Sequence, residues 1–309
     1  MRDVLVIMLV FLGAALALTR PAIGILFWTW VSIMNPHRLA WSFAEDFPVA
    51  AVIGGATLIG LVLTKEKRNF FITAPSVTLA LFIIWMIITY PFSIDVQGST
   101  DMLTRVLKID LMILVALIVL HSKQHIIALV WVLVISLGFY GVKGGIFTLL
   151  TGGHYHVWGP EASFIGGNNE IALALTIIIP FMYFLLDQSH KLWQRAAWVV
   201  VISLTAIATI GTLSRGALLA VTAMMALLWL RGRQRLLIGV LVIGGGILLF
   251  NFMPNAWHSR MDTIETYKQD PSAMGRIHAW HMTWNLANKK LLGGGFSIYG
   301  IEDYERYLG

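Results

Sequence analysis

Two charge-free apolar runs flank a short polar break in this sequence, and that arrangement constrains the fold most strongly. The runs are residues 196–210 and 217–230, and the break between them reads Gly-Thr-Leu-Ser-Arg-Gly. Arg215 in the break therefore lies at or just inside the edge of a hydrocarbon slab. Because its guanidinium stays protonated, it requires an anionic partner or water there. We expect either a ligand site or an arginine that snorkels to the headgroups and fixes helix depth.

The composition is that of a membrane protein. Hydrophobic residues make up 58% of the 309 residues and charged residues 12%, whereas a soluble domain carries roughly 25% charged residues. Much of the net charge of +6 lies in short loops between apolar runs, where it orients helices, so we predict no nucleic-acid partner. The absence of cysteine excludes disulfide bonds, a thiol nucleophile and thiolate metal sites.

We predict an all-α polytopic bundle of about nine or ten membrane spans over residues 1–253. Residues 254–309 are more polar and are predicted to form an aqueous helical segment on the outer face. Residues 4–34 form either two short helices or one broken span, because Pro21 divides them into pieces shorter than the ~20 residues of a span. Residues 93–104 are predicted to be an outer loop. The remaining predicted spans are residues 47–63, 74–90, 106–120, 126–150, 171–186, 198–210, 217–230 and 236–252.

Three basic clusters determine the predicted orientation of the spans. Residues 65–68, 191–195 and 231–235 carry Lys and Arg in short loops, and such loops stay on the cytoplasmic side. The loop at 152–169, which has no Lys or Arg, then faces outward, as do all residues from 254 onward.

Arginines and amides gather on the predicted outer face. Guanidinium groups bind a pyrophosphate bidentately, so a phosphate-bearing ligand is one interpretation of these arginines. Ser214 adds a hydroxyl to the same stretch. Asn168 and Asn169 either hydrogen-bond such a ligand or act as the N-cap of the span that follows them. The outer arginines are Arg215, Arg260 and Arg276.

Residues 272–288 are predicted to form an amphipathic helix with Ser272 as its N-cap. Arg276, Trp280 and Trp284 recur every four residues and therefore share one face. Aromatic residues with a basic residue on one face are typical of a helix at a membrane interface. They also suit a sugar–phosphate ligand, since indole stacks on a pyranose and guanidinium binds phosphate.

Histidines are the remaining candidates for chemistry, and we predict neither a metal site nor a cofactor. His154 and His156 have only Glu161 nearby as a third ligand, and His278 and His281 have helical spacing. His281 could also act as a general base. No nucleophile elbow, Walker loop, zincin motif or dinucleotide-binding fingerprint is present in the sequence.

Several segments together carry a resemblance to a known family. Residues 212–217 resemble the SRGA motif of the O-antigen ligase and polymerase superfamily. Residues 260–264 and 270–276, with Trp280, resemble the start of that family's large periplasmic loop, and residues 292–296 resemble its glycine-rich ending. The order and spacing of these segments carry the resemblance, which covers nearly the whole chain.

Residues 167–173, with Pro180, are similar to one branch of the superfamily, the O-glycosylation ligases associated with exosortase A systems. The resemblance implies a multi-pass protein of the bacterial inner membrane with its active face in the periplasm. It also implies metal-independent, inverting transfer of a glycan from an undecaprenyl-pyrophosphate-linked donor to a lipid or protein acceptor. Membrane lipids are then further partners.

The resemblance also assigns roles within the chain. Residues 1–253 correspond to the transmembrane bundle and residues 254–309 to the start of the large periplasmic loop. The family's proposed catalytic histidine and its last spans lie beyond Gly309, so we expect a fragment or a truncated product whose base is unknown. The alternatives are a lipid-linked glycan polymerase and a transporter or flippase for lipid-linked glycans. The implied substrate-binding residues are Arg215, Arg276, Asn169, Ser214 and Arg260.

Overall fold

The structure of the protein is a computed structural model that describes residues 2–40, 42–64, 72–231, 235–262, 268 and 270–307. Every regular element in these ranges is a helix, which confirms the predicted all-α fold class. The elements are α1 (Arg2–Thr19), α2 (Pro21–Met34), η1 (Pro36–Leu39), α3 (Val49–Leu63), α4 (Ala74–Thr89), η2 (Tyr90–Phe92), α5 (Val96–Val119), α6 (Lys123–Leu150), α7 (Asn168–Asp187), α8 (Leu192–Gly211), α9 (Arg215–Arg231), α10 (Arg235–Phe252), α11 (Asn255–Asp262), α12 (Pro271–Lys289) and α13 (Ile301–Tyr307).

Several helices are long and apolar enough to cross a membrane. Five in the described ranges meet this condition, namely α1, α4 continued through η2, α6, α7 and α8, and shorter apolar helices accompany them. Only 6% of the apolar stretch of α4 and η2 is buried inside the protein, so most of this helix is available to lipid. The chain is therefore a multi-pass membrane protein, as predicted.

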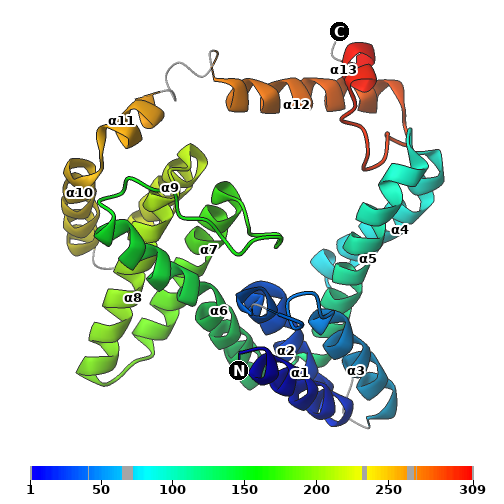
Figure 1. The fold of residues 1–309 in the computed structure, drawn as a ribbon, viewed down its shortest axis with the longest axis horizontal. Helices are drawn as coiled ribbons and strands as arrows, with labels where there is room; N and C mark the ends of the chain where they lie inside the picture. The colour runs from blue at the N-terminus through cyan, green and yellow to red at the C-terminus, as the bar shows by residue number, and fades with distance from the viewer. Residues whose placement is uncertain are drawn as a thin grey trace. The chain divides into compact units, whose positions relative to one another are not determined.

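The helices divide into two compact units, which are described separately (Figure 1). The first unit comprises Met1–Thr64 and Lys123–Ile264, and the second comprises Lys65–Ser122 and Glu265–Gly309. The boundary predicted between residues 253 and 254, which separates bundle from loop, stays a prediction.

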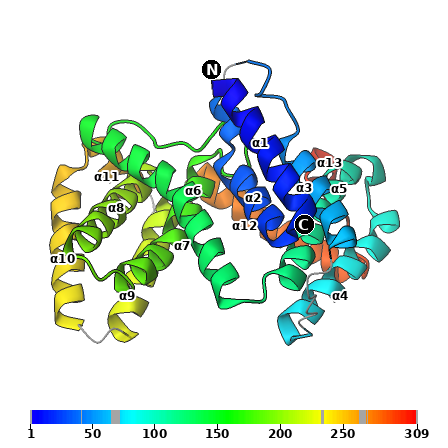
Figure 2. The same cartoon turned by 90° about the horizontal axis from the view of Figure 1, so that it is seen from below.

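In the first unit, α1, α2 and α3 pack side by side (Figures 1 and 2). Gly13 of α1 lies against Phe27 of α2, and Ala17 lies against Gly24, so these two helices run antiparallel. Residues 4–34 thus form two separate helices, which decides between the two predicted alternatives. A Cβ atom on Gly60 of α3 would collide with the backbone of α1, so the small residue is required for this close helix contact.

The rest of the core of the first unit lies between α6, α7 and α8. Gly141 of α6 lies against Thr205 of α8, and Thr148 lies against Gly211, so α6 and α8 run in the same direction. The intervening α7 must then run in the opposite direction. This places the C-terminal ends of α6 and α8 beside the N-terminus of α7. The buried side chains between them include Val134, Leu137, Ile171, Leu175, Ile178 and Met182.

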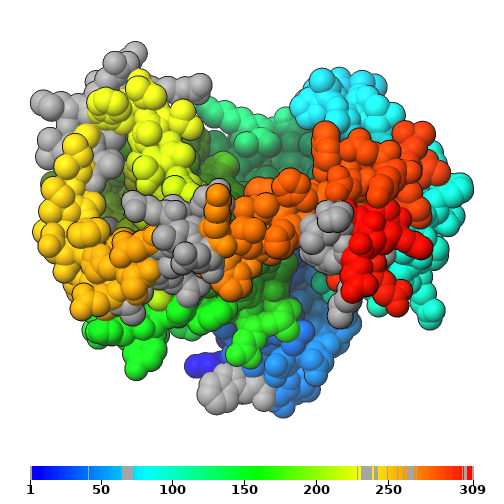
Figure 3. Space-filling model, turned by 90° about the horizontal axis from the view of Figure 1, so that it is seen from above, coloured from blue at the N-terminus to red at the C-terminus, as the bar shows by residue number. Residues whose placement is uncertain are grey.

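The second unit contains α4, α5, α12 and α13, with α12 and α13 drawn in orange and red in Figure 3. A glycine-rich loop after α12 docks on the start of α5. The N–H of Ile94 donates to the carbonyl of Gly294 at 2.9 Å, and the hydroxyl of Ser99 accepts from the N–H groups of Phe296 and Ser297 at 3.1 and 3.2 Å. Segments about 200 residues apart in the chain are therefore joined by hydrogen bonds.

Two helix starts differ from the prediction. The predicted outer loop at residues 93–104 is mostly helix, because Asp95 caps α5 and accepts from the N–H of Gly98 at 2.8 Å. The N-cap of α12 is Asp270 rather than Ser272, and its carboxylate accepts from the N–H of Ala273 at 2.8 Å. In both cases an aspartate satisfies the free N–H groups of the first turn.

Candidate anion-binding site

The candidate site is built around the turn that joins α8 to α9. Residues 212–214 form this turn, and Arg215 is the first residue of α9. Leu213 has a φ of 55°, a left-handed conformation that costs a non-glycine residue roughly 1–3 kcal/mol. Its side chain is buried against Met253 and Trp257, and this packing stabilises the turn. The turn is thus held in one conformation by α11 and the residues just before it.

Ser214 caps α9 and connects it to α7. Its Oγ accepts from the N–H of Ala217 at 3.2 Å and donates to Oδ1 of Asn169 at 2.7 Å. The first bond satisfies one of the free N–H groups at the helix start. Because Oδ1 of this exposed asparagine is turned toward Ser214, its Nδ2 group, which carries two N–H donors, points away from that hydroxyl.

Asn168 makes a second link between α7 and the turn. Its Nδ2 donates to the carbonyl oxygen of Thr212 at 3.1 Å. The helix begins at Asn168 and its N-cap is Gly167, so the interpretation of either asparagine as the N-cap is wrong. The two amides instead occupy the first two positions of α7 and reach across to the turn.

Two helix N-termini therefore meet beside Arg215. Each carries free N–H groups and a partial positive charge of roughly +0.5. The first turn of α9 has no acidic residue, and the helix dipole disfavours a cation there by about 0.3–1 kcal/mol. Glu170 supplies a negative charge in the first turn of α7, where its carboxylate lies beside Gly167. Glu170 offsets the positive end of α7, so the positive end of α9 and the arginine provide the charge pattern that suits an anion.

The support beneath the turn comes from α6 and the long loop that follows it. A Cβ atom on Gly211 would collide with the hydroxyl of Thr148, so only glycine permits this approach of α8 to α6. The carbonyl of Gly211 accepts from the N–H of Val157 at 3.0 Å, which places the loop against the turn. Thr212 and Ser214 are buried, and neighbouring packing of this kind holds the side chains of the turn in position.

In the second unit, α12 presents the predicted aromatic and basic face. Arg276, Trp280 and Trp284 are all exposed, with 70% and 71% exposure for the two tryptophans. Met282 and Leu286 project from the opposite face and are buried. The shared face expected from the four-residue spacing is confirmed.

The predicted site residues are thus distributed over both units. In the first unit Ser214 contacts Asn169 and directly precedes Arg215, whereas Arg276 belongs to the second unit. Convergence of Arg215 and Arg276 on one ligand stays a prediction. The backbone of Arg260 is part of α11, but its side chain lies outside the described part of the chain.

Comparison with known families divides the chain between residues 190 and 198, where α7 connects to α8. The profile of a family of unknown function, DUF5935, matches residues 1–190, which is more than half of the chain. The chain belongs to the DUF5935 family. The profile of the O-antigen ligase family matches residues 198–308, so this DUF5935 protein also carries an O-antigen ligase domain. No curated protein and no solved structure matches the chain significantly.

The candidate site of this DUF5935 protein spans both matched regions. Asn168 and Asn169 belong to the DUF5935 region, whereas Ser214 and Arg215 belong to the O-antigen ligase domain. The hydrogen bonds between them join the two regions at the turn. The O-antigen ligase domain supports the resemblance to that superfamily, and the branch associated with exosortase stays a prediction.

One histidine near the turn was missed by sequence reasoning. The described ranges contain no group of three or more His, Cys, Asp or Glu side chains that could hold a metal ion. His154 and His156 therefore belong to no such group there. His258 lies in α11 beside Trp257, and its Nε2 is 3.1 Å from the carbonyl of Met253. A carbonyl only accepts, so Nε2 of His258 donates this hydrogen bond. The position of this histidine beside the turn depends on packing that no local sequence signal indicates.

Proposed function

We propose that this protein transfers a glycan from an undecaprenyl-pyrophosphate-linked donor to a lipid or protein acceptor at the periplasmic face of the inner membrane. The observation that carries the proposal is the bond between Ser214 and Asn169. It joins the N-termini of α7 and α9 next to Arg215, and Ser214 and Arg215 lie within the O-antigen ligase domain. A pyrophosphate fits this arrangement because its charges suit the N-terminus of α9 and a guanidinium.

The outward orientation of the turn is supported by the distribution of basic residues. Lys191 and Arg195 lie where α7 connects to α8, at the opposite end of these helices from the turn. Basic residues in short loops stay on the cytoplasmic side. The turn at residues 212–214 then faces the periplasm, where a lipid-linked glycan and its acceptor meet.

In the proposed reaction, a hydroxyl of the acceptor attacks the anomeric carbon of the glycan from the face opposite the pyrophosphate. The new C–O bond forms as the bond from the anomeric carbon to the pyrophosphate oxygen breaks, which inverts the configuration. The acceptor proton passes to a base that is not assigned in this sequence. Arg215 stabilises the charge that develops on the leaving pyrophosphate, and Asn169 orients the donor through Nδ2.

Arg276 has a related role in this proposal. Its guanidinium is exposed at the start of the aromatic face of α12, where it can bind the same pyrophosphate or a phosphate of the acceptor. Arg260 is proposed as a further ligand contact, since its helix α11 packs on the turn through Trp257. Association with an exosortase system is proposed from the sequence resemblance alone.

The experiment that tests this function is glycan transfer in proteoliposomes that contain a lipid-linked oligosaccharide and candidate acceptors. Arg215→Lys and Arg276→Lys should each lose most activity, because an ammonium cannot reproduce the planar fork of a guanidinium. Arg38→Lys is the matched control, since Arg38 forms ion pairs with Glu45 and Asp46 at 3.8 and 3.7 Å. Undiminished transfer by the Arg215→Lys variant would remove Arg215 from the site.

The products of the same assay separate the alternatives. Release of undecaprenyl pyrophosphate with a glycosylated acceptor supports a ligase, whereas longer glycans that stay attached to the pyrophosphate lipid indicate a polymerase. Movement of intact donor across the membrane without release of pyrophosphate would indicate a transporter and contradict the proposal.

A further inference from the structure

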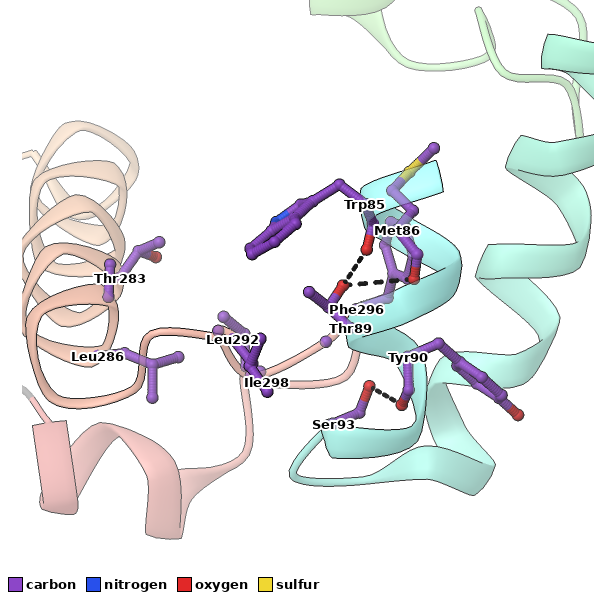
Figure 4. A pocket seen from close by; sticks show the side chains of 14 residues that line it. Trp85, Met86, Thr89, Tyr90, Ser93, Thr283, Leu286, Leu292, Phe296 and Ile298 are labelled. Carbon is purple, nitrogen blue, oxygen red and sulfur yellow. Dashed lines mark hydrogen bonds between the residues drawn. The ribbon is translucent and has the colours of Figure 1, made fainter. Parts of the chain in front are cut away.

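The second unit contains a pocket of about 250 Å³ at the end of α4, where that helix meets α12 and the glycine-rich loop (Figure 4). The indole of Trp85 reaches from α4 toward α12, while Leu292 and Ile298 lie on the loop side. No lining residue carries a charge. The volume is below the ~300–1,000 Å³ typical of pockets that enclose a whole small ligand, so this pocket suits a segment of a longer molecule.

The hydroxyl groups in the pocket wall have already used their donors. Thr89 donates to the carbonyl of Trp85 at 2.9 Å, and Ser93 donates to that of Tyr90 at 2.7 Å, as Figure 4 shows. Thr283 donates to the carbonyl of its own helix four residues earlier at 2.7 Å. A sugar requires several free donors and acceptors, whereas a hydrocarbon requires none. The wall therefore favours a hydrocarbon segment.

The position of the pocket identifies the source of that hydrocarbon. α4 is one of the helices able to span a membrane, and its exposed side includes Phe82 and Ile88 at 56% and 50% exposure. The pocket lies at the C-terminal end of this span, where Tyr90 marks the zone that aromatic residues occupy at a membrane interface. Membrane lipid is thus the apolar molecule that reaches the pocket.

A cation lies at a suitable spacing from the pocket for a phosphate. Arg276 and Thr283 are seven residues apart on α12, so they share a face and are separated by roughly 10 Å along the helix axis. Trp280 lies between them on this face and is exposed. A lipid with its chain against Thr283 would bring its phosphate toward Arg276.

We propose that this pocket binds the phosphate-proximal isoprene units of the polyprenyl lipid, with Arg276 on the phosphate. The inference rests on the proposed function, from which it takes the polyprenyl donor. It adds a binding site for the lipid part of that donor and assigns the glycine-rich loop a role in it. Gly293 and Gly295, with φ of 72° and 86°, allow the loop to form one wall of the pocket.

Single cysteines provide the test, because the chain has none of its own. Thr283→Cys places a thiol in the pocket, and Ser272→Cys places a control thiol on the exposed start of the same helix. Thr89→Cys, on the opposite wall, is a second reporter in case the first disturbs the fold. The rate of maleimide modification is measured in phosphatidylcholine vesicles with increasing polyprenyl monophosphate, and in parallel with phosphatidylglycerol at equal charge.

Polyprenyl phosphate should slow modification at residues 283 and 89 several-fold and saturably, and should leave residue 272 unchanged. Arg276→Gln in the Thr283→Cys background should shift the saturation to higher lipid content. No protection, equal protection at residue 272, or equal protection by phosphatidylglycerol would each overturn the proposal. Protection without glycan transfer would contradict only the proposed function, and transfer without protection would contradict only the pocket.

Discussion

The hydroxyl of Ser214 makes two hydrogen bonds with separable energies, and its removal gives a quantitative prediction. Ser214→Ala deletes the N-cap bond to Ala217 and the bond to Asn169. Loss of an N-cap costs about 0.5–2 kcal/mol, and loss of a net intramolecular hydrogen bond costs about 0.5–1.5 kcal/mol. The free energy of unfolding should therefore fall by about 1–3.5 kcal/mol. Asn169→Ala removes only the second bond and should cost about 0.5–1.5 kcal/mol.

The assay is a double-mutant cycle measured by SDS titration of the protein in mixed micelles. Circular dichroism and tryptophan fluorescence must report the same transition, so that free energies are defined. The Ser214→Ala, Asn169→Ala double variant should be about as stable as Ser214→Ala alone, which gives a coupling of about 0.5–1.5 kcal/mol. Thr222→Ala is the control on the same helix, because its hydroxyl bonds only to the backbone of α9, and it should stay within about 0.5 kcal/mol. Strictly additive losses would refute the bond between α7 and α9.

Three further predictions follow from the rest of the structure. Ser259→Cys should react with an impermeant maleimide added outside spheroplasts, whereas His190→Cys should react only after permeabilisation; the reverse pattern would invert the predicted topology. Gly295→Ala should destabilise the protein by roughly 1–3 kcal/mol, because φ at this position is 86° and a Cβ atom would collide with neighbouring side chains. Gly275 lies in open space within α12, so the control Gly275→Ala should stabilise the protein by up to about 1 kcal/mol. Burial, and to a smaller extent the adjacent Arg38, lower the pKa of His37 in the folded protein. The contribution of His37 to stability is therefore present above its unfolded pKa of about 6.5 and is lost as the pH falls from that value toward the lower folded pKa. The free energy of unfolding of His37→Gln should lack this loss at low pH.

Much of the helical architecture could be predicted because long apolar runs have few alternatives in a membrane. The predicted span at residues 236–252 differs from α10 (Arg235–Phe252) by one residue. The start of α5 was missed because its first turns are polar and read as a loop. Asp95 and the contact of Ser99 with the glycine-rich loop stabilise those turns as helix, and this contact joins segments too far apart for sequence patterns to indicate.

The candidate site was only partly predictable for the same reason. Arg215 is conspicuous in sequence because it is a charge between apolar runs, and the SRGA resemblance adds to that signal. The pairing of Ser214 with Asn169 depends on the direction in which α6, α7 and α8 pack. The left-handed conformation of Leu213 depends on burial against α11. No local pattern encodes either contact, so the turn could be predicted as a candidate site but its hydrogen bonds could not.

The central claim is that Arg215 binds the donor pyrophosphate, and the affinity for undecaprenyl pyrophosphate tests it most directly. The dissociation constant is measured by calorimetry for the wild type, Arg215→Gln and the control Arg38→Gln in one detergent. A charge-assisted hydrogen bond contributes about 1.5–3 kcal/mol, so Arg215→Gln should weaken binding roughly 10- to 150-fold while Arg38→Gln leaves it unchanged. Equal affinity of wild type and Arg215→Gln, or equal weakening in both variants, would contradict the account.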